Sequence, residues 1–310
     1  MFEAVYAHAP GQLALSLGDD WLFTTGPDLL INGFELKQDM IVTPKSNLVE
    51  SRPWSQSMLT CLAANVSDDK TLAAGALNGQ VLLLKVNNES GECTFERTVL
   101  VFPLPVRAVC MSQSGRFVMA GGEYYIFFSC LFPNPPRSDC IVKVCDVSVS
   151  KQVDLNGHSS RILSIAYDEP SMLLATMSTS EVLLWSVKEL MSGDKREPIG
   201  KYKFSTKVRS DWSVQISWNE KCELAVPDGN KVVILDANLG VKRRIDDCAP
   251  KTADTLVCAF GKHFLFTAGT DGFVRIFDPA SGLMALQFAA CEKAILGLAV
   301  GREDKLIYIV

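Results

Sequence analysis

Histidine is scarce in this chain of 310 residues, which has only three, and none lies near a cluster of cysteines. Because histidine is the usual general base and a common zinc ligand, its scarcity argues against acid–base catalysis and against a zinc site. The nucleophile, metalloprotease, paired-carboxylate and phosphate-loop motifs of enzymes are missing as well. We therefore expect a protein that is not an enzyme and that uses no cofactor, metal or small-molecule substrate.

Long apolar runs and an excess of positive charge are also missing. The longest apolar run, 124–132, is too short to span a bilayer. The N-terminus has no basic start followed by an apolar block, so it does not read as a signal peptide. The net charge of −5 argues against a chain built as a whole to coat nucleic acid. We expect a soluble intracellular protein that makes no membrane contact.

Cysteine is plentiful, with ten residues, but no two are spaced as C-x-x-C. Most stand inside apolar runs of the kind that form strands. Such cysteines are typical of small buried residues in a reducing compartment.

The segment 151–190 shows a recognisable unit. It combines Gly157-His158, three short β-rich runs, and Trp185 near the end of the third run. This is the pattern of a WD-type unit, a four-stranded antiparallel blade of about 40–45 residues. Because one blade cannot bury both of its faces, further copies are expected on either side.

Six other segments repeat the pattern: 13–36, 59–86, 106–147, 211–236, 255–278 and 295–310. Asn78-Gly79 and Asp271-Gly272 stand at the same offset before the third run, and both are favoured hairpin turns. The sequence therefore predicts an all-β fold, a single seven-bladed WD-repeat β-propeller over 1–310 whose last blade is incomplete. We expect an N-terminal fragment of a longer protein, with run 306–310 as an exposed edge that aggregates or dimerises.

Two segments interrupt the repeats. An aromatic, proline-ended insertion at 124–138 enters the third blade, and it is a partner-binding loop, a lid on its own blade, or translated intron sequence. The connection 188–210 is rich in basic residues, among them Lys201, Lys203, Lys207 and Arg209. It is either a solvated loop or a contact for nucleic acid or for an acidic segment of a partner.

The best-formed WD units bury a network of histidine, strand hydroxyl, turn aspartate and tryptophan. Here Thr179-Ser180 replace Asp-Gly, and Met177 stands near the usual hydroxyl position. We expect an incomplete network and a purely structural His158. Partner-binding residues are expected just before the first strand of each unit, where Arg161 and Trp212 stand, since Arg and Trp are enriched in binding hot spots.

Several runs resemble the N-terminal propeller of the WD-repeat and HMG-box DNA-binding proteins, the replisome hubs of the chromosome transmission fidelity family. The runs are 141–147, 155–158, 182–185, 214–218, 224–227, 231–235 and 292–299. Leu224-Ala-Val-Pro227, following a run that ends in Trp218, is the most particular of them. The likeness spans nearly the whole chain and fails at 124–138, at Thr179-Ser180 and at the end.

This resemblance implies a nuclear, non-enzymatic scaffold in DNA replication and sister-chromatid cohesion. The family ties the replicative helicase to DNA polymerase alpha–primase, and this domain would make protein or DNA contacts from one face. The family's second propeller and HMG box are not in this chain. The alternatives are an unrelated adaptor propeller, such as a ubiquitin-ligase substrate receptor or an RNA-processing scaffold, and an enzyme.

Overall fold

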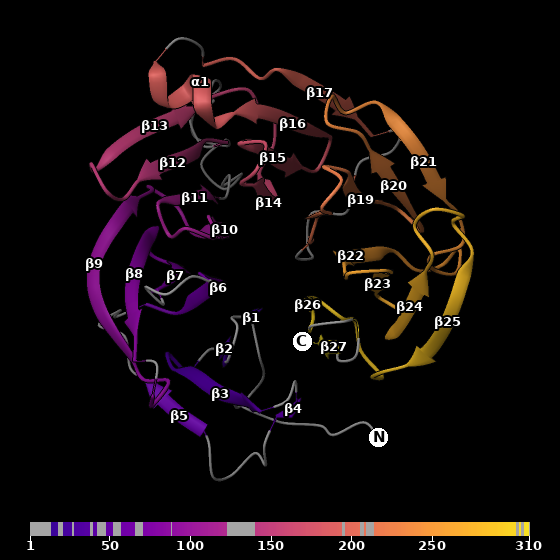
Figure 1. The fold of residues 1–310 in the computed structure, drawn as a ribbon, viewed down its shortest axis with the longest axis horizontal. Helices are drawn as coiled ribbons and strands as arrows, with labels where there is room; N and C mark the ends of the chain where they lie inside the picture. The colour runs from indigo at the N-terminus through magenta and orange to yellow at the C-terminus, as the bar shows by residue number, and fades with distance from the viewer. Residues whose placement is uncertain are drawn as a thin grey trace, which may run out of the picture. The chain divides into compact units, whose positions relative to one another are not determined.

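The computed structural model of the chain is an all-β protein built from antiparallel sheets (Figure 1). It describes residues 14–17, 21–26, 28–37, 40–41, 48–51, 57–65, 71–87, 89–122, 140–193, 196–204, 208, 214–301, 304 and 307–309. The chain divides into two compact units, Met1–Asp154 and Leu155–Val310. Apart from Leu48–Ser51, which pairs with the third strand of the first sheet, successive strands of a sheet are also successive in the chain, and this is the blade arrangement of a β-propeller.

The first unit contains three sheets. The first sheet has β1 (Ala14–Leu17), β2 (Trp21–Thr25), β3 (Ile31–Lys37), β4 (Met40–Ile41) and β5 (Leu48–Ser51). The second has β6 (Leu59–Ala64), β7 (Thr71–Ala76), β8 (Gln80–Val86) and β9 (Cys93–Val101). The third has β10 (Val106–Met111), β11 (Phe117–Gly122), β12 (Val142–Asp146) and β13 (Lys151–Leu155). Both β4 and β5 pair with β3.

The second unit contains three more four-stranded sheets. The first has β14 (Ile162–Asp168), β15 (Leu173–Ser178), β16 (Glu181–Ser186) and β17 (Gly200–Lys203), with helix α1 (Val187–Ser192) before β17. The second has β18 (Ser217–Trp218), β19 (Leu224–Asp228), β20 (Lys231–Leu235) and β21 (Val241–Ile245). The third has β22 (Thr255–Phe260), β23 (Leu265–Gly269), β24 (Phe273–Phe277) and β25 (Met284–Ala289).

The number of blades differs from the sequence prediction. Six sheets have four or more strands, whereas seven blades were expected. The last predicted unit is a two-stranded sheet of β26 (Leu298–Val300) and β27 (Ile307–Ile309). Its two apolar runs do form strands, but among the described residues nothing extends the pair to a blade. The predicted third runs of the other six units are confirmed as strands β3, β8, β12, β16, β20 and β24.

The core lies between neighbouring sheets of each unit. Inner and central strands are covered on both faces, so β15 and β16 are buried at almost every residue. Met177 and Leu184 from one sheet pack with Val226 and Leu235 from the next in a single apolar cluster. Fully burying a side chain of this size stabilises the fold by about 1.5–3 kcal/mol. The outer strand β17 instead alternates half-buried and exposed residues.

A side-chain hydroxyl on the innermost strand of one sheet is bonded to the backbone of the next innermost strand at four places. These contacts are Ser16 Oγ with Ala64 N (2.7 Å), Thr60 Oγ1 with Val106 O, Ser164 Oγ with Ile216 N (3.2 Å) and Ser217 Oγ with Phe260 N (3.2 Å). Each contact joins two sheets of the same unit, so the hydroxyls align neighbouring sheets as well as filling space between them.

The two predicted hairpin turns are confirmed. Gly79 and Gly272 have φ of 86° and 73°, in the left-handed region that glycine tolerates. A Cβ on either would lie 2.1 Å from a backbone oxygen, that of Phe102 or of Cys291. The insertion 124–138 lies outside the described residues. No helix in the described part of the chain is long and apolar enough to cross a membrane.

Candidate functional site

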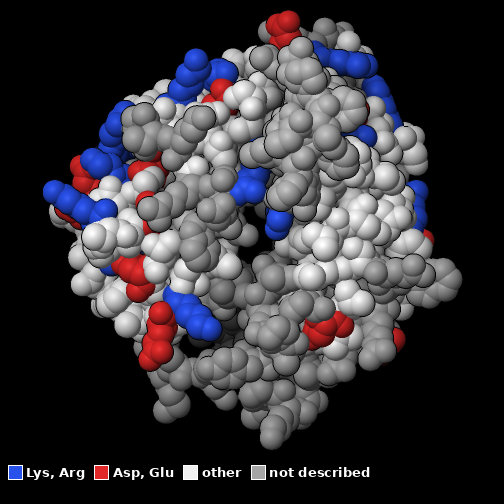
Figure 2. Space-filling view, turned by 180° about the vertical axis from the view of Figure 1, so that it is seen from behind, with Lys and Arg blue, Asp and Glu red and all other residues white. Residues whose placement is uncertain are grey.

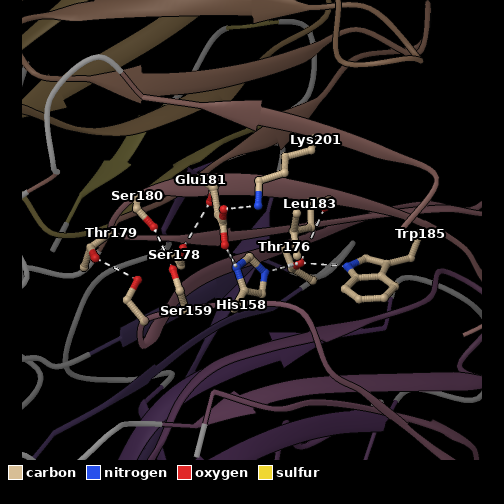
Figure 3. A network of polar contacts seen from close by, with 11 residues as sticks. His158, Ser159, Thr176, Ser178, Thr179, Ser180, Glu181, Leu183, Trp185 and Lys201 are labelled. Carbon is tan, nitrogen blue, oxygen red and sulfur yellow. Dashed lines mark hydrogen bonds and ion pairs between the residues drawn. The ribbon is translucent and has the colours of Figure 1, made fainter. Parts of the chain in front are cut away.

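A buried chain of hydrogen bonds joins His158, Thr176 and Trp185 inside the β14–β17 sheet (Figure 3). The indole Nε1 of Trp185 donates to Oγ1 of Thr176 at 2.9 Å. The same Oγ1 lies 2.7 Å from Nε2 of His158. The Thr176 hydroxyl also donates to the Leu183 carbonyl at 3.4 Å, and the direction of its bond with His158 depends on the tautomer of the ring.

Glu181 lies beside this chain, between His158 and Lys201. Its Oε1 lies 3.8 Å from Nδ1 of His158, and its Oε2 lies 2.5 Å from Nζ of Lys201. The Glu181 side chain is only 5% exposed, whereas that of Lys201 is 42% exposed. A buried carboxylate needs a compensating charge. Lys201 supplies it from β17, with its ammonium next to the carboxylate (Figure 3).

Burial controls the charge of His158. Loss of solvation lowers the pKa of this imidazole from 6.5 to about 4; the nearby Glu181 carboxylate opposes the shift and Lys201 adds to it. His158 is therefore neutral at physiological pH. It is also enclosed, because the side chain has no exposed surface. A neutral, sealed imidazole orients its neighbours and has no contact with a substrate.

Thr176 supplies the strand hydroxyl, which was not expected, but the network is incomplete, as predicted: Nδ1 of His158 and Oε1 of Glu181 lie 3.8 Å apart, and neither atom has a hydrogen-bond partner among the described residues. Residues next to each other on a strand point to opposite faces. Met177 therefore packs in the apolar cluster, while Thr176 turns its hydroxyl to Trp185. The carboxylate comes from Glu181, the first residue of β16, and not from the turn at Thr179-Ser180. The alternation of strand residues could have identified Thr176; nothing in the sequence pointed to Glu181 or Lys201.

The surface predicted to bind partners lies next to this network. Arg161 is half-buried and directly precedes β14. Beside it in the chain, Ser160 accepts a hydrogen bond of 2.8 Å from the Thr179 hydroxyl. The exposed Ser159 lies 3.4 Å from the hydroxyl of Ser180. The structure thus brings the segment before β14 and the β15–β16 turn together as one hydroxyl-rich surface. Trp212, the other predicted residue, lies outside the described residues.

The basic connection reaches the same turn. Backbone N–H groups of Phe204 and Val208 donate to the carbonyls of Ser180 and Thr179 at 3.1 and 2.9 Å. A loop was expected here, but part of this segment forms the outer strand β17, because Tyr202 and Phe204 pack on the core. Lys203 is exposed beside them.

Four cations were predicted to bind an anionic partner. Among those that the structure describes, only Lys203 is exposed and not paired with the buried Glu181. Lys201 forms an ion pair with Glu181. Lys207 and Arg209 lie outside the described residues. Figure 2 shows Lys and Arg side chains interspersed with Asp and Glu over the face that it presents, without one large basic patch on the described surface. An anion contact at β17 would therefore be local.

A groove lies between the β18–β21 and β22–β25 sheets. It has a volume of about 470 Å³, and its lining includes Lys221, Phe260, Lys262, His263 and Asp278. Charges of both signs line the groove, and the Lys242 ammonium is bonded there to the Glu223 carboxylate. The mixed charge does not select a cation or an anion.

The cysteines do not form a chemical site in the described part of the chain. All nine described cysteines are free thiols, and six of them are buried, as the sequence predicted. Burial raises the pKa of Cys61 and of Cys248 to about 12. Within the described residues, no group of three or more His, Cys, Asp or Glu side chains could hold a metal ion.

Comparisons with known proteins identify the fold and no family. No family model matches the chain, and no curated protein matches it. Among solved structures it is similar to the crystal structure of the computationally designed Ika8 protein, with a TM-score of 0.68 at 14% sequence identity. The match covers 96% of this chain and 80% of the designed protein. At this identity the likeness concerns the backbone alone. The fold is therefore that of an all-β β-propeller, and six blades are detected among the described residues.

Proposed function

We propose that this chain is a non-enzymatic scaffold that binds other proteins. The observation that carries the proposal is the His158 network, where the residue best suited to acid–base chemistry is neutral, enclosed and used to hold a sheet together. Propellers commonly present such rigid sheets as a frame, and the exposed residues around the frame bind partners. The hydroxyl-rich surface around Arg161 is the part of this frame best suited to a polar partner.

The more specific role we propose is that of a nuclear replisome hub. Its partners would be DNA polymerase alpha–primase and the replicative helicase. Support comes from the sequence runs that resemble the WD-repeat and HMG-box DNA-binding proteins, especially Leu224-Ala-Val-Pro227. These four residues lie in β19, next to the apolar cluster shared with the β14–β17 sheet. Because these are core positions, partner binding needs a test at the surface.

The test uses purified DNA polymerase alpha–primase and replicative helicase with the wild-type chain and with Arg161→Glu. We expect wild type to bind at least one partner and Arg161→Glu to weaken that binding by about tenfold or more, as for a hot-spot residue. Arg196→Glu, a charge reversal at an exposed position away from this surface, is the control and should bind like wild type. A wild-type chain that binds neither assembly contradicts the replisome role. Recovery of ubiquitin-ligase or RNA-processing proteins by proximity labelling would favour an adaptor of another system.

A DNA contact made by the basic connection 188–210, together with cations of the neighbouring outer strand, is a further part of this proposal. β17 carries Lys203, and β21 of the adjacent sheet carries Lys242, Arg243 and Arg244. A hydrogen bond between Tyr202 and Asp228 links β17 to that sheet, and the charge of Arg244 acts on the same carboxylate. The two strands thus carry cations on neighbouring sheets; because Lys242 is paired with Glu223, Lys203, Arg243 and Arg244 are the residues we propose to contact phosphates.

A further inference from the structure

β25 differs from every other outer strand that closes a four-stranded sheet in the described part of the chain. Its sequence, Met284-Ala-Leu-Gln-Phe-Ala289, contains no charged residue. The corresponding strands β9, β13, β17 and β21 each contain at least two charged residues. Charges on an edge strand discourage pairing with another chain. β25 lacks this protection.

The apolar residues of β25 are exposed. Leu283, just before the strand, is 71% exposed, and Met284 and Leu286 are 49% and 54% exposed. In monomeric proteins isolated exposed apolar residues are common, but a group of them on one strand marks an interaction site. The strand is also the last in its sheet, so within that sheet only its β24 side is paired (Figure 1).

Pairing with β24 shows how the side chains of β25 are arranged. Leu286 pairs with Ile276 and Phe288 with Val274. Val274, Ile276 and Phe288 belong to the apolar cluster that contains Leu298 of β26, and Leu286 lies two residues from Phe288, on the same face of the strand. Gln287 pairs with Arg275, on the opposite face. The pairing shifts register between Ile276 and Phe277, beside Met284, so the regular part of β25 is 285–289.

We propose that β25 pairs antiparallel with β25 of a second copy of this chain. An antiparallel pair of identical strands has a twofold axis, so it closes as a dimer and does not propagate. With the axis at Gln287, Leu286 of each copy lies opposite Phe288 of the other, and Ala285 lies opposite Ala289. Aliphatic–aromatic cross-strand pairs of this kind stabilise a sheet. The absence of charge means that two copies meet without like-charge repulsion, whereas two β21 strands would bring three cations against three.

The first test measures the mass of the chain by sedimentation equilibrium from about 1 µM to about 1 mM, the range in which small interfaces saturate. We expect a reversible change from monomer to dimer. Leu286→Lys should raise the dimer dissociation constant by at least about tenfold, because it adds a charge to each side of the pair. Val241→Lys, at an apolar residue of β21 that is 46% exposed, is the matched control and should leave the constant unchanged. Melting temperatures of both variants establish that they fold.

The second test reads the register. In a Cys291→Ser background, which removes the thiol that is exposed among the described cysteines, Gln287→Cys should form an intermolecular disulfide under mild oxidation. Ala285→Cys should not, because the two copies of residue 285 would be about 13 Å apart at the spacing of a strand. A wild-type chain that stays monomeric overturns the proposal, and the partner of β25 would then be an extended segment of another protein. Association that Leu286→Lys does not weaken, or equal crosslinking at 285 and 287, overturns it too.

Discussion

Gln215 and Leu298 exchange two hydrogen bonds across the second unit. Nε2 of Gln215 donates to the Leu298 carbonyl at 2.8 Å, and the Leu298 N–H donates to Oε1 of Gln215 at 3.1 Å. Between them lies β22, whose Leu256 carbonyl and Cys258 N–H are bonded to the backbone of Gln215, both at 3.0 Å. One residue thus joins the segment before β18 to both β22 and β26.

Replacing Gln215 should destabilise the protein measurably. Gln215→Ala leaves a backbone donor and a backbone acceptor of β26 without this partner, a loss worth about 1–3 kcal/mol. Urea unfolding would measure the change in the free energy of unfolding. Gln113→Ala, at an exposed glutamine in a turn, should leave that free energy unchanged. Equal stability of the two variants would show that water replaces the side chain without cost.

Thr176 should be intolerant of losing its hydroxyl. Thr176→Val keeps the shape of the side chain but leaves the Trp185 indole N–H and the His158 ring without their shared partner. Each orphaned buried group costs about 1–3 kcal/mol. Thr176→Ser restores the hydroxyl, so it should recover most of the loss in the same urea experiment. A valine variant as stable as the serine variant would contradict the role assigned to this hydrogen-bond chain.

His158 should make the fold less stable in mild acid. In the unfolded chain the imidazole takes up a proton near its ordinary pKa of 6.5, whereas in the fold its pKa is about 4. Between these values the unfolded state binds more protons. The free energy of unfolding therefore falls as the pH is lowered from about 6.5 to 4, by about 1.4 kcal/mol per pH unit.

The measurement is chemical unfolding at a series of pH values. His158→Gln should lose this part of the pH dependence, even if its stability at neutral pH is lower. His263→Gln, which alters an exposed histidine, should keep the wild-type slope. If the slopes of all three proteins agree, His158 is not the group that titrates.

Thiol reactivity should follow burial. Cys291 is exposed and should be alkylated by iodoacetamide in the folded protein. Cys61 and Cys248 should stay unmodified, because burial raises the pKa of each to about 12 and only the thiolate reacts. Mass spectrometry of tryptic peptides, with and without urea, gives the order in which the thiols react. Modification of Cys61 at the rate of Cys291 in the absence of urea would contradict it.

The proposed DNA contact predicts a charge-specific loss of affinity. Lys203→Gln, Lys207→Gln and Arg209→Gln together should weaken duplex DNA binding and lower the salt slope by about 0.9 for each phosphate that is no longer neutralised. Fluorescence anisotropy at several salt concentrations measures both quantities. Lys201→Gln belongs in a separate variant, because it uncovers the Glu181 carboxylate and should lower stability.

The matched control for this experiment removes the same charge elsewhere. Lys85→Gln, Lys151→Gln and Lys251→Gln, all at exposed positions, should leave DNA affinity nearly unchanged. If the two triple variants lose affinity equally, binding follows net charge and not the basic connection.

The sequence was informative where local signals specify structure. Alternating apolar runs predicted most strands, and the turns at Gly79 and Gly272 located the hairpins because glycine alone fits there. It was misleading at β17, whose four residues include two lysines and read as a solvated connection. This segment forms a strand because Tyr202 packs on the next sheet, and that contact depends on tertiary structure.

Partners far apart in the chain could not be predicted. Gln215 and Leu298 are 83 positions apart. Which polar groups meet depends on how neighbouring strands align. The number of blades was overestimated for a related reason, since two apolar runs near the end predict strands without saying how many others join them.

The hydroxyl contacts between innermost strands all run in one direction along the chain. In each of them, from Ser16 to Ser217, the side chain belongs to one sheet and the backbone group to a neighbouring one. In all four contacts the hydroxyl lies on the sheet that comes first in the chain. A ribosome releases the earlier sheet first. Each finished sheet of a unit therefore already displays the group that aligns the next strand to emerge, so the protein can assemble in the order of its synthesis.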